Sequence, residues 1–168
     1  MMDENTKKTA LRMIPYGLYV LTSADGRGNA AAATVNWVTQ ASFKPPLVVV
    51  GVKVDSGAHE LIKDTKCFAL NVLGKGQQGM AFAFFKPAEL DGHTLSGERF
   101  FTEVTGSPLL ESAAAWLDCR LQHVYESGDH SVFVGEVVGA GVKHTPDGRA
   151  DDLTLTLKDL GDKVFYGG

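Results

Sequence analysis

Polar side chains able to contact a ligand gather between residues 30 and 42, in the segment AAAATVNWVTQAS. Against an alanine-rich background, this segment carries hydroxyl, amide and indole groups: Thr34, Asn36, Trp37, Thr39, Gln40 and Ser42. Such groups can hydrogen-bond a flat polar heterocycle while the indole packs against it. The alternative is the ordinary polarity of an edge strand with Trp37 as a core aromatic, which composition alone favours.

A second candidate is the segment KVDSGAH, residues 53–59, where a strand ends and a helix begins. The free N–H groups of the helix N-terminus, the Ser56 hydroxyl and the Lys53 ammonium together would suit a phosphate group. His59 lies on the first turn of that helix and is compatible with this site. In the alternative, Ser56 only caps the helix and Lys53 is solvated. The segment by itself favours neither.

The sequence Gly128-Asp129-His130 places a carboxylate and an imidazole at the start of a strand. A lone histidine there is usually a hydrogen-bonded structural residue, and Asp129 is equally a turn former. No serine with a positioned base and no metal-ligand spacing occurs elsewhere, and His59-Glu60 lacks the second histidine of a zinc hydrolase. We therefore expect no metal site.

One motif points towards a dinucleotide. Residues 74–79, GKGQQG, match G-x-G-x-x-G and follow a strand. A Rossmann unit next needs a full helix and a second buried strand, yet Pro87 stops the helix early and no such strand follows. A glycine-rich turn is the favoured interpretation.

The elements that must position these residues are mostly short strands. Apolar periodicity and turn residues predict helices over 3–14 and 55–65, a helix or buried apolar segment over 80–85, and a polar surface loop over 87–97. They predict strands over 17–23, over the two halves of 30–54 on either side of Lys44-Pro45-Pro46, and over 67–73, 115–126, 132–142 and 153–157.

In the predicted strand 115–126, Asp118, Arg120 and Gln122 alternate with apolar residues and are expected to face water. Three glycines in 132–142 would permit a bend or bulge. Six or seven strands joined mainly by turns indicate a mainly β fold with short helices, a closed or partly closed antiparallel barrel.

Composition limits the partners. The 168 residues are expected to form a single domain, and 16 basic against 20 acidic residues give a net charge of −4 without a basic stripe. Nucleic acid and anionic membranes are therefore not expected partners.

The apolar run Leu47 to Val52 is far too short to cross a bilayer, and the start lacks a signal-peptide pattern, so a cytoplasmic location is expected. Cys67 and Cys119 are expected to be reduced core thiols.

Three ordered segments together resemble the flavin reductase family with its FMN-binding split barrel. They are GLYVLTSADGRGNAAAATVNWVTQASFKPPLVVVGV, KVDSGAHELIKDTKCFALNVL and WLDCRLQHVYESGDHSVFVGEVV. The closing LTLKDLGDKVFYGG resembles the tail of the flavoredoxin-like branch. The resemblance covers residues 12–168 and implies one FMN-binding domain with a split, antiparallel, Greek-key-like β-barrel. It also implies a homodimer.

By resemblance, the flavin site falls on residues in the segments described above, with two additions. The ring would contact Ala33, Thr34, Val35, Asn36, Trp37 and Ser42, and the phosphate side would involve Lys53, Ser56, His59 and Lys86. His130 would line the face where nicotinamide stacks, and Tyr166 in the tail would cover the ring. Members of the family fold NAD(P)H directly against the flavin, so a nicotinamide donor needs no Rossmann unit.

The resemblance implies hydride transfer from NAD(P)H to FMN and then to free flavin or a protein acceptor. The cofactor carries that chemistry, which fits the lack of a catalytic triad. Two alternatives stay open: an electron-transfer flavoprotein reduced by a redox protein partner, and a non-catalytic FMN-binding module.

Overall fold

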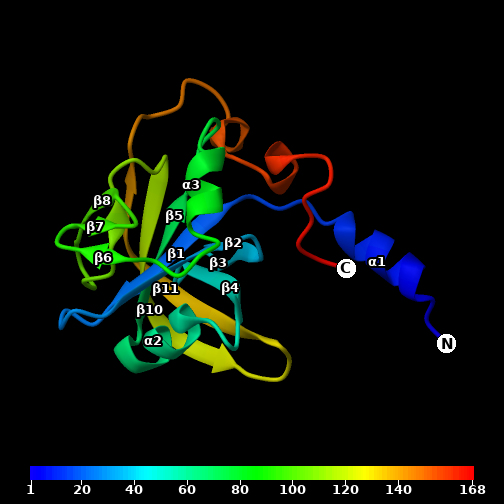
Figure 1. Cartoon of the computed structure of the whole chain (residues 1–168), viewed down its shortest axis with the longest axis horizontal. Helices are drawn as coiled ribbons and strands as arrows, with labels where there is room; N and C mark the ends of the chain where they lie inside the picture. Colours follow the sequence, from blue (N-terminus) through cyan, green and yellow to red (C-terminus); the bar gives the residue numbers. More distant parts are fainter.

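The computed structural model describes residues 1–168 and is mainly β (Figure 1). One seven-stranded antiparallel sheet has the order β2-β1-β5-β10-β11-β4-β3. Its strands are β1 (Tyr19–Ala24), β2 (Ala30–Val35), β3 (Val38–Ser42), β4 (Leu47–Lys53), β5 (Cys67–Val72), β10 (Ala115–Tyr125) and β11 (His130–Val142). A second, small sheet contains β6 (Leu90–Asp91), β7 (Thr94–Leu95), β8 (Glu98–Phe101) and β9 (Leu109–Leu110). The mainly β fold with short helices is the one that the sequence predicts.

The main sheet curls because consecutive strands lie at its opposite edges. β2 pairs with β1 at one edge and β3 pairs with β4 at the other, yet only Asn36 and Trp37 separate β2 from β3 in the chain. The sequence predicts one strand over the first half of 30–54, and the structure breaks it in two at these residues. A single straight strand could not pair with both edges. The chain thus joins the two edges at Asn36 and Trp37, and the sheet forms the predicted split barrel.

Three helices accompany the sheets: α1 (Glu4–Arg12), α2 (Gly57–Thr65) and α3 (Gln78–Ala83). α2 begins as predicted, because the Ser56 side chain accepts a hydrogen bond from the N–H of His59. Residues 74–77 form a tight turn in which the Gln77 amide oxygen accepts from the N–H of Gly74, at 2.7 Å, and Gln78 and Gly79 already belong to α3. The helix that follows has only six residues, so this turn does not open a dinucleotide-binding unit.

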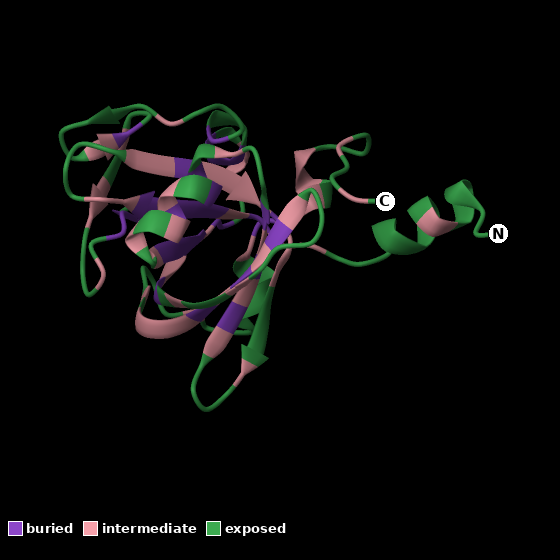
Figure 2. Cartoon of the chain, turned by 90° about the horizontal axis from the view of Figure 1, so that it is seen from below, coloured by how far each residue is buried: buried purple, intermediate pink, exposed green.

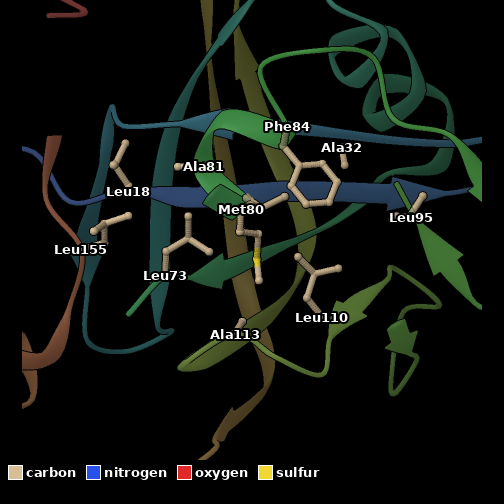
Figure 3. Close-up of a cluster of buried hydrophobic side chains, with 11 residues drawn as sticks. Leu18, Ala32, Leu73, Met80, Ala81, Phe84, Leu95, Leu110, Ala113 and Leu155 are labelled. Atoms are coloured by element: carbon tan, nitrogen blue, oxygen red, sulfur yellow. The ribbon is translucent and has the colours of Figure 1, made fainter. Parts of the chain in front are cut away.

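Two hydrophobic clusters stabilise the fold. One joins side chains of the main sheet to α2, with Ile62, Phe68 and Phe133 fully buried. The other lies between β1, α3 and the small sheet, where Met80 and Phe84 meet Leu18 and residues further along the chain (Figure 3). In Figure 2 the buried residues lie within the body of the molecule, whereas the outer loops and the projecting α1 are mostly exposed.

The long strands β10 and β11 carry the predicted irregularity. Their register shifts between Asp118 and Cys119, opposite the segment Val137 to Gly139. At Gly135 a Cβ atom would lie 2.4 Å from Cζ of Phe68. Glycine is therefore required there for the buried phenyl ring to cross the strand.

Three predictions are wrong in detail. Residues 87–97 contain β6 and β7, and Leu95 is fully buried by the small sheet instead of lying in a polar loop. Residues 153–157 are not a strand: two 3₁₀ helices, Ala150–Leu153 and Leu157–Leu160, flank isolated bridges at Thr154 and Thr156. Asp118 is buried, because the loop over β10 covers it and the N–H groups of Val104 and Thr105 donate to its carboxylate.

Both ends of the chain lie on the same side of the molecule (Figure 1). α1 projects from the body and buries none of its residues. Residues 161–168, the C-terminal tail, run beside it, and Arg12 Nε donates to the carbonyl of Gly167 at 3.2 Å. None of the helices has the length and apolar character needed to cross a membrane.

Candidate functional site

A cavity of about 270 Å³ lies where the two edges of the main sheet meet. Its walls come from the end of β2, the end of β4 with the start of α2, the segment after α3, the start of β11, and the tail. Ten of its sixteen lining residues are hydrophobic, so the site suits a mostly apolar, flat ligand with a few polar contacts. Eight of the twelve residues predicted from the sequence line it: Ala33, Thr34, Val35, Asn36, Lys53, Ser56, His130 and Tyr166.

The β2 wall uses its polar side chains to hold neighbouring segments. The Thr34 hydroxyl donates to the carbonyl of Ala81 at 2.7 Å, and the Thr34 N–H donates to the carbonyl of Phe84 at 3.0 Å. The Asn36 amide donates to the carbonyl of Tyr166 at 3.2 Å. These bonds fix α3 and the tail against the end of β2.

An aromatic cluster of Trp37, His130 and Tyr166 borders the cavity. The ring centroid of Trp37 lies 4.5 Å from that of His130 and 5.2 Å from that of Tyr166. Trp37 does not itself line the cavity, and its buried Nε1 has no hydrogen-bond partner. His130 and Tyr166, whose rings contact the indole, do line the cavity. Trp37 therefore supports these two side chains on the side that faces away from the cavity.

His130 is held at both ring nitrogens. Nδ1 lies 2.9 Å from an Asp129 carboxylate oxygen, and Nε2 lies 2.6 Å from the Tyr166 hydroxyl. The hydrogen bond from His130 lowers the pKa of Asp129, and partial burial raises the pKa of the Tyr166 phenol. Both shifts favour an ionised carboxylate and a neutral phenol beside the imidazole at neutral pH.

Lys53 and Ser56 lie together at the end of β4 and the start of α2, where Lys53 is the cross-strand partner of His130. The Ser56 hydroxyl donates to the carbonyl of Lys53 at 2.8 Å and accepts from the N–H of His59 at 3.2 Å. The Lys53 ammonium is exposed and lies 3.5 Å from the Asp55 carboxylate. Ser56 therefore caps α2, and both the Ser56 hydroxyl and the Lys53 side chain also line the cavity.

Three further predicted residues, Ser42, His59 and Lys86, do not line the cavity. The His59 imidazole is buried on the opposite side of α2, with Nε2 2.8 Å from the Ser131 hydroxyl and its ring 5.1 Å from that of Phe133. It faces the core because α2 packs this face onto the sheet. Ser42 ends β3 beyond the join between the sheet edges, and Lys86 is exposed just after the lining residue Phe85.

Sequence reasoning missed the apolar part of the lining. It consists of Leu18, Gly51, Val52, Phe84, Phe85, Leu157, Val164 and Phe165. Residues from five separate segments have no common pattern in the sequence. The only available signals were the apolar run 80–85 directly before Lys86 and the aromatic pair Phe165-Tyr166 in the tail.

The residues present fit a flavin. Aromatic and aliphatic side chains would contact its ring, while Lys53 and Ser56 at a helix start could hold a phosphate. The cavity is slightly smaller than the range of roughly 300 to 1,000 Å³ found for drug-sized ligands. A flavin would therefore extend from the ring pocket to the mouth, where Lys53 is exposed.

Comparison with known proteins agrees with this geometry. Residues 11–160 match the model of the flavin reductase like domain. The chain is 30% identical over 154 residues to the NADH-dependent flavin reductase StyB of Pseudomonas fluorescens, covering 92% of this chain and 86% of StyB. The solved structure of the NADH:FAD oxidoreductase SgcE6 of Streptomyces globisporus, in complex with NAD and FAD fragments, superposes with a TM-score of 0.66 at 32% identity. That superposition covers 77% of this chain and 76% of SgcE6.

Other relatives are considerably longer. Diflavin flavoprotein A 1 of Synechocystis is 32% identical over 154 residues, which are 91% of this chain but 26% of that protein. The chain spans 42%, 21% and 57% of three further relatives, two from Rhizobium meliloti and one from Synechocystis. The family is thus found both as short proteins and as part of larger ones. With nearly its whole length matched, this chain belongs to the flavin reductase family.

Proposed function

We propose that this protein is an oxidoreductase that transfers hydride from C4 of NAD(P)H to N5 of a bound flavin, and that the flavin is FMN. The single observation that carries the proposal is the cavity, in which the end of β2, the start of α2 and His130 meet around one apolar space. These are the segments on which the family resemblance places flavin ring, phosphate and nicotinamide. The names of StyB and SgcE6 support NADH as donor, and SgcE6 leaves FAD as the rival flavin.

The side chains take the following roles in this proposal. Ala33, Thr34, Val35 and Asn36 form the wall of the flavin ring, with Trp37 behind them. Lys53 and Ser56 bind the phosphate end, and Lys86, which is exposed next to the mouth, reaches it from the other side. His130 positions the nicotinamide. The protein's contribution is to hold two rings in contact and to offset the charge of the reduced flavin.

Spectroscopy of the purified protein tests this function. We expect FMN to bind with a perturbed visible spectrum, more tightly than FAD or riboflavin, and NADH or NADPH to bleach it anaerobically. Failure to bind any flavin would refute the proposal. Stronger binding of FAD than of FMN would overturn only the choice of flavin, and bound FMN that neither nicotinamide bleaches would overturn the donor.

The second candidate is an electron-transfer flavoprotein whose flavin is reduced by a protein partner. It is favoured by the match to one quarter of a diflavin flavoprotein, where a domain of this kind is part of a larger protein. In this case a reduced ferredoxin or rubredoxin would reduce the bound flavin rapidly, while NADH and NADPH would do so slowly.

We further propose that residues 1–168 act as one domain that pairs into a homodimer in the cytoplasm. Free Cys67 and Cys119 are in keeping with a reducing compartment. Exposed Leu11, Met13 and Ile14 at the end of the projecting α1 offer apolar surface to a second subunit. Sedimentation of the purified protein should give twice the mass of 18.0 kDa.

A further inference from the structure

The C-terminal tail is a thin partition between two cavities. Leu157, Val164, Phe165 and Tyr166 line the candidate site of about 270 Å³ and also a second cavity of about 410 Å³. The far wall of the second cavity is formed by residues 12–16, directly after α1. A flavin together with a nicotinamide needs more room than the first cavity offers. The second cavity adjoins the first behind the tail and offers additional room.

The tail is held by ring contacts, of Phe165 with the Arg12 guanidinium and of Tyr166 with Trp37, and by few hydrogen bonds. Three hydrogen bonds join it to distant parts of the chain: from Arg12 to the carbonyl of Gly167, from Asn36 to the carbonyl of Tyr166, and between His130 and the Tyr166 hydroxyl. No strand pairing includes residues 161–168, and the side chains of Phe165 and Tyr166 are half-exposed. Such a segment can be displaced at small cost in free energy.

The hydrogen bonds of His130 define which of its ring nitrogens can accept a hydrogen bond from the tail. In a neutral imidazole one nitrogen donates and the other accepts. The Asp129 carboxylate can only accept, so Nδ1 carries the proton and Nε2 presents its lone pair. The Tyr166 hydroxyl, 2.6 Å away, donates to it. The carboxamide N–H of a nicotinamide would need this same lone pair.

We propose that the tail occupies the nicotinamide half of the site in the resting protein. Tyr166 donates to the nitrogen of His130 that the carboxamide needs, and Asp129 is the positioning residue that keeps this nitrogen an acceptor. When NAD(P)H binds, its carboxamide N–H replaces the Tyr166 hydroxyl as the hydrogen-bond donor to His130, and the tail moves towards the second cavity. The inference rests on the proposed function, because it takes a nicotinamide as the competing ligand.

Two measurements test it. In the full-length protein without flavin, ¹⁵N NMR of the His130 ring should show the proton on Nδ1, and Asp129→Ala should shift it largely to Nε2. Asp55→Ala is the matched control, since it removes a neighbouring carboxylate that pairs with Lys53 and does not contact His130. An unchanged tautomer in Asp129→Ala would overturn the positioning role.

The second measurement uses Tyr166→Phe, which keeps the ring on Trp37 and removes the hydroxyl. In the FMN-loaded protein we expect NAD⁺ to bind about two- to tenfold more tightly and the KM for NADH to fall by a similar factor. A fall in the KM for NADH that exceeds any change in kcat is the signature of a competitor at the nicotinamide half, and it is needed here because Tyr166 also lines the candidate flavin cavity. Tyr125→Phe, at an exposed tyrosine that lines neither cavity, is the control.

The outcomes separate the two proposals. NAD⁺ affinity that is unchanged or weaker in Tyr166→Phe, in a protein whose flavin NADH still reduces, would overturn the competition and leave the proposed function intact. A wild-type protein whose bound flavin neither NADH nor NADPH reduces would overturn both. Weaker FMN binding in Tyr166→Phe would assign Tyr166 to the flavin and overturn its place in the nicotinamide half.

Discussion

The indole of Trp37 packs against the imidazole of His130, with ring centroids 4.5 Å apart and planes tilted by 50°. Gly51 of the neighbouring strand β4 makes this contact possible. Its N–H donates to the carbonyl of Trp37 at 2.9 Å, and a Cβ atom at Gly51 would lie 3.1 Å from Cε3 of the indole. The join between the two sheet edges and the position of His130, which we propose positions the nicotinamide, thus depend on the same tryptophan.

Gly51→Ala should displace the indole and, with it, His130. We expect a loss of about 1 kcal/mol in the free energy of unfolding, as for a small overpacking change, together with a shifted tryptophan emission. Urea unfolding monitored by fluorescence measures both. Gly57→Ala is the control, because nothing lies within 4 Å of a Cβ atom there. Equal stability of the wild type and Gly51→Ala would contradict the tight contact.

Ser56 has two functions that substitution can separate. Ser56→Ala removes the cap of α2 and should cost about 1 kcal/mol of stability, besides weakening FMN binding. Ser56→Asp keeps a capping oxygen and adds a negative charge, so stability should stay near that of the wild type while FMN binding weakens.

Riboflavin, which lacks the phosphate, is the control ligand for these variants. Its affinity should change little in Ser56→Asp, because no phosphate meets the added charge. If Ser56→Asp weakened riboflavin and FMN binding equally, Ser56 would not lie at the phosphate end.

His59 is expected to serve stability and not the ligand. His59→Ala removes a buried ring and its hydrogen bond to Ser131, which should cost about 2 kcal/mol. The affinity for FMN should stay within twofold, because the imidazole does not line the cavity. Lys53→Ala is the reverse case, with weakened FMN binding and unchanged stability. Isothermal titration measures the FMN affinity of both variants, and thermal unfolding measures their stability. A large loss of FMN affinity in His59→Ala would disprove a purely structural role of His59.

Asp159 should give the protein a component of stability that acid removes. The hydrogen bond from Lys75, with further bonds from Thr156, lowers its pKa from 3.8 to about 2. Because the pKa is lower in the folded state, this stability is fully present above about pH 4 and is lost as the pH falls towards 2.

Asp159→Asn is the corresponding variant. At pH 7 it should lower the free energy of unfolding by about 0.5 to 1 kcal/mol, a modest figure because solvent screens the ion pair with Lys75. The difference from the wild type should disappear between pH 4 and pH 2 in urea titrations. A difference that persists unchanged at pH 2 would show that charge is not its cause.

Local patterns in the sequence predict most of the strands and helices and several of the chemical groups of the site. Alternation and turn residues predicted β1, β4, β5, β10 and β11, since half-buried strands need a period of two. Ser56 as a helix cap followed from its side-chain chemistry. Residues 33–36 and His130 were placed in one site by family resemblance, and the structure brings them to one cavity.

Tertiary structure decided which faces those groups present and which distant segments meet. His59 and Ser56 are close in the chain, yet one faces the core and the other the cavity, because α2 packs one side on the sheet. Asp118 alternates like a solvent-facing residue and is buried by a loop that pattern cannot place. The contact of Tyr166 with His130 depends on a tail without regular structure, whose path is set by three distant hydrogen bonds. Periodicity reports only local geometry, so such contacts between distant segments leave no pattern in the sequence.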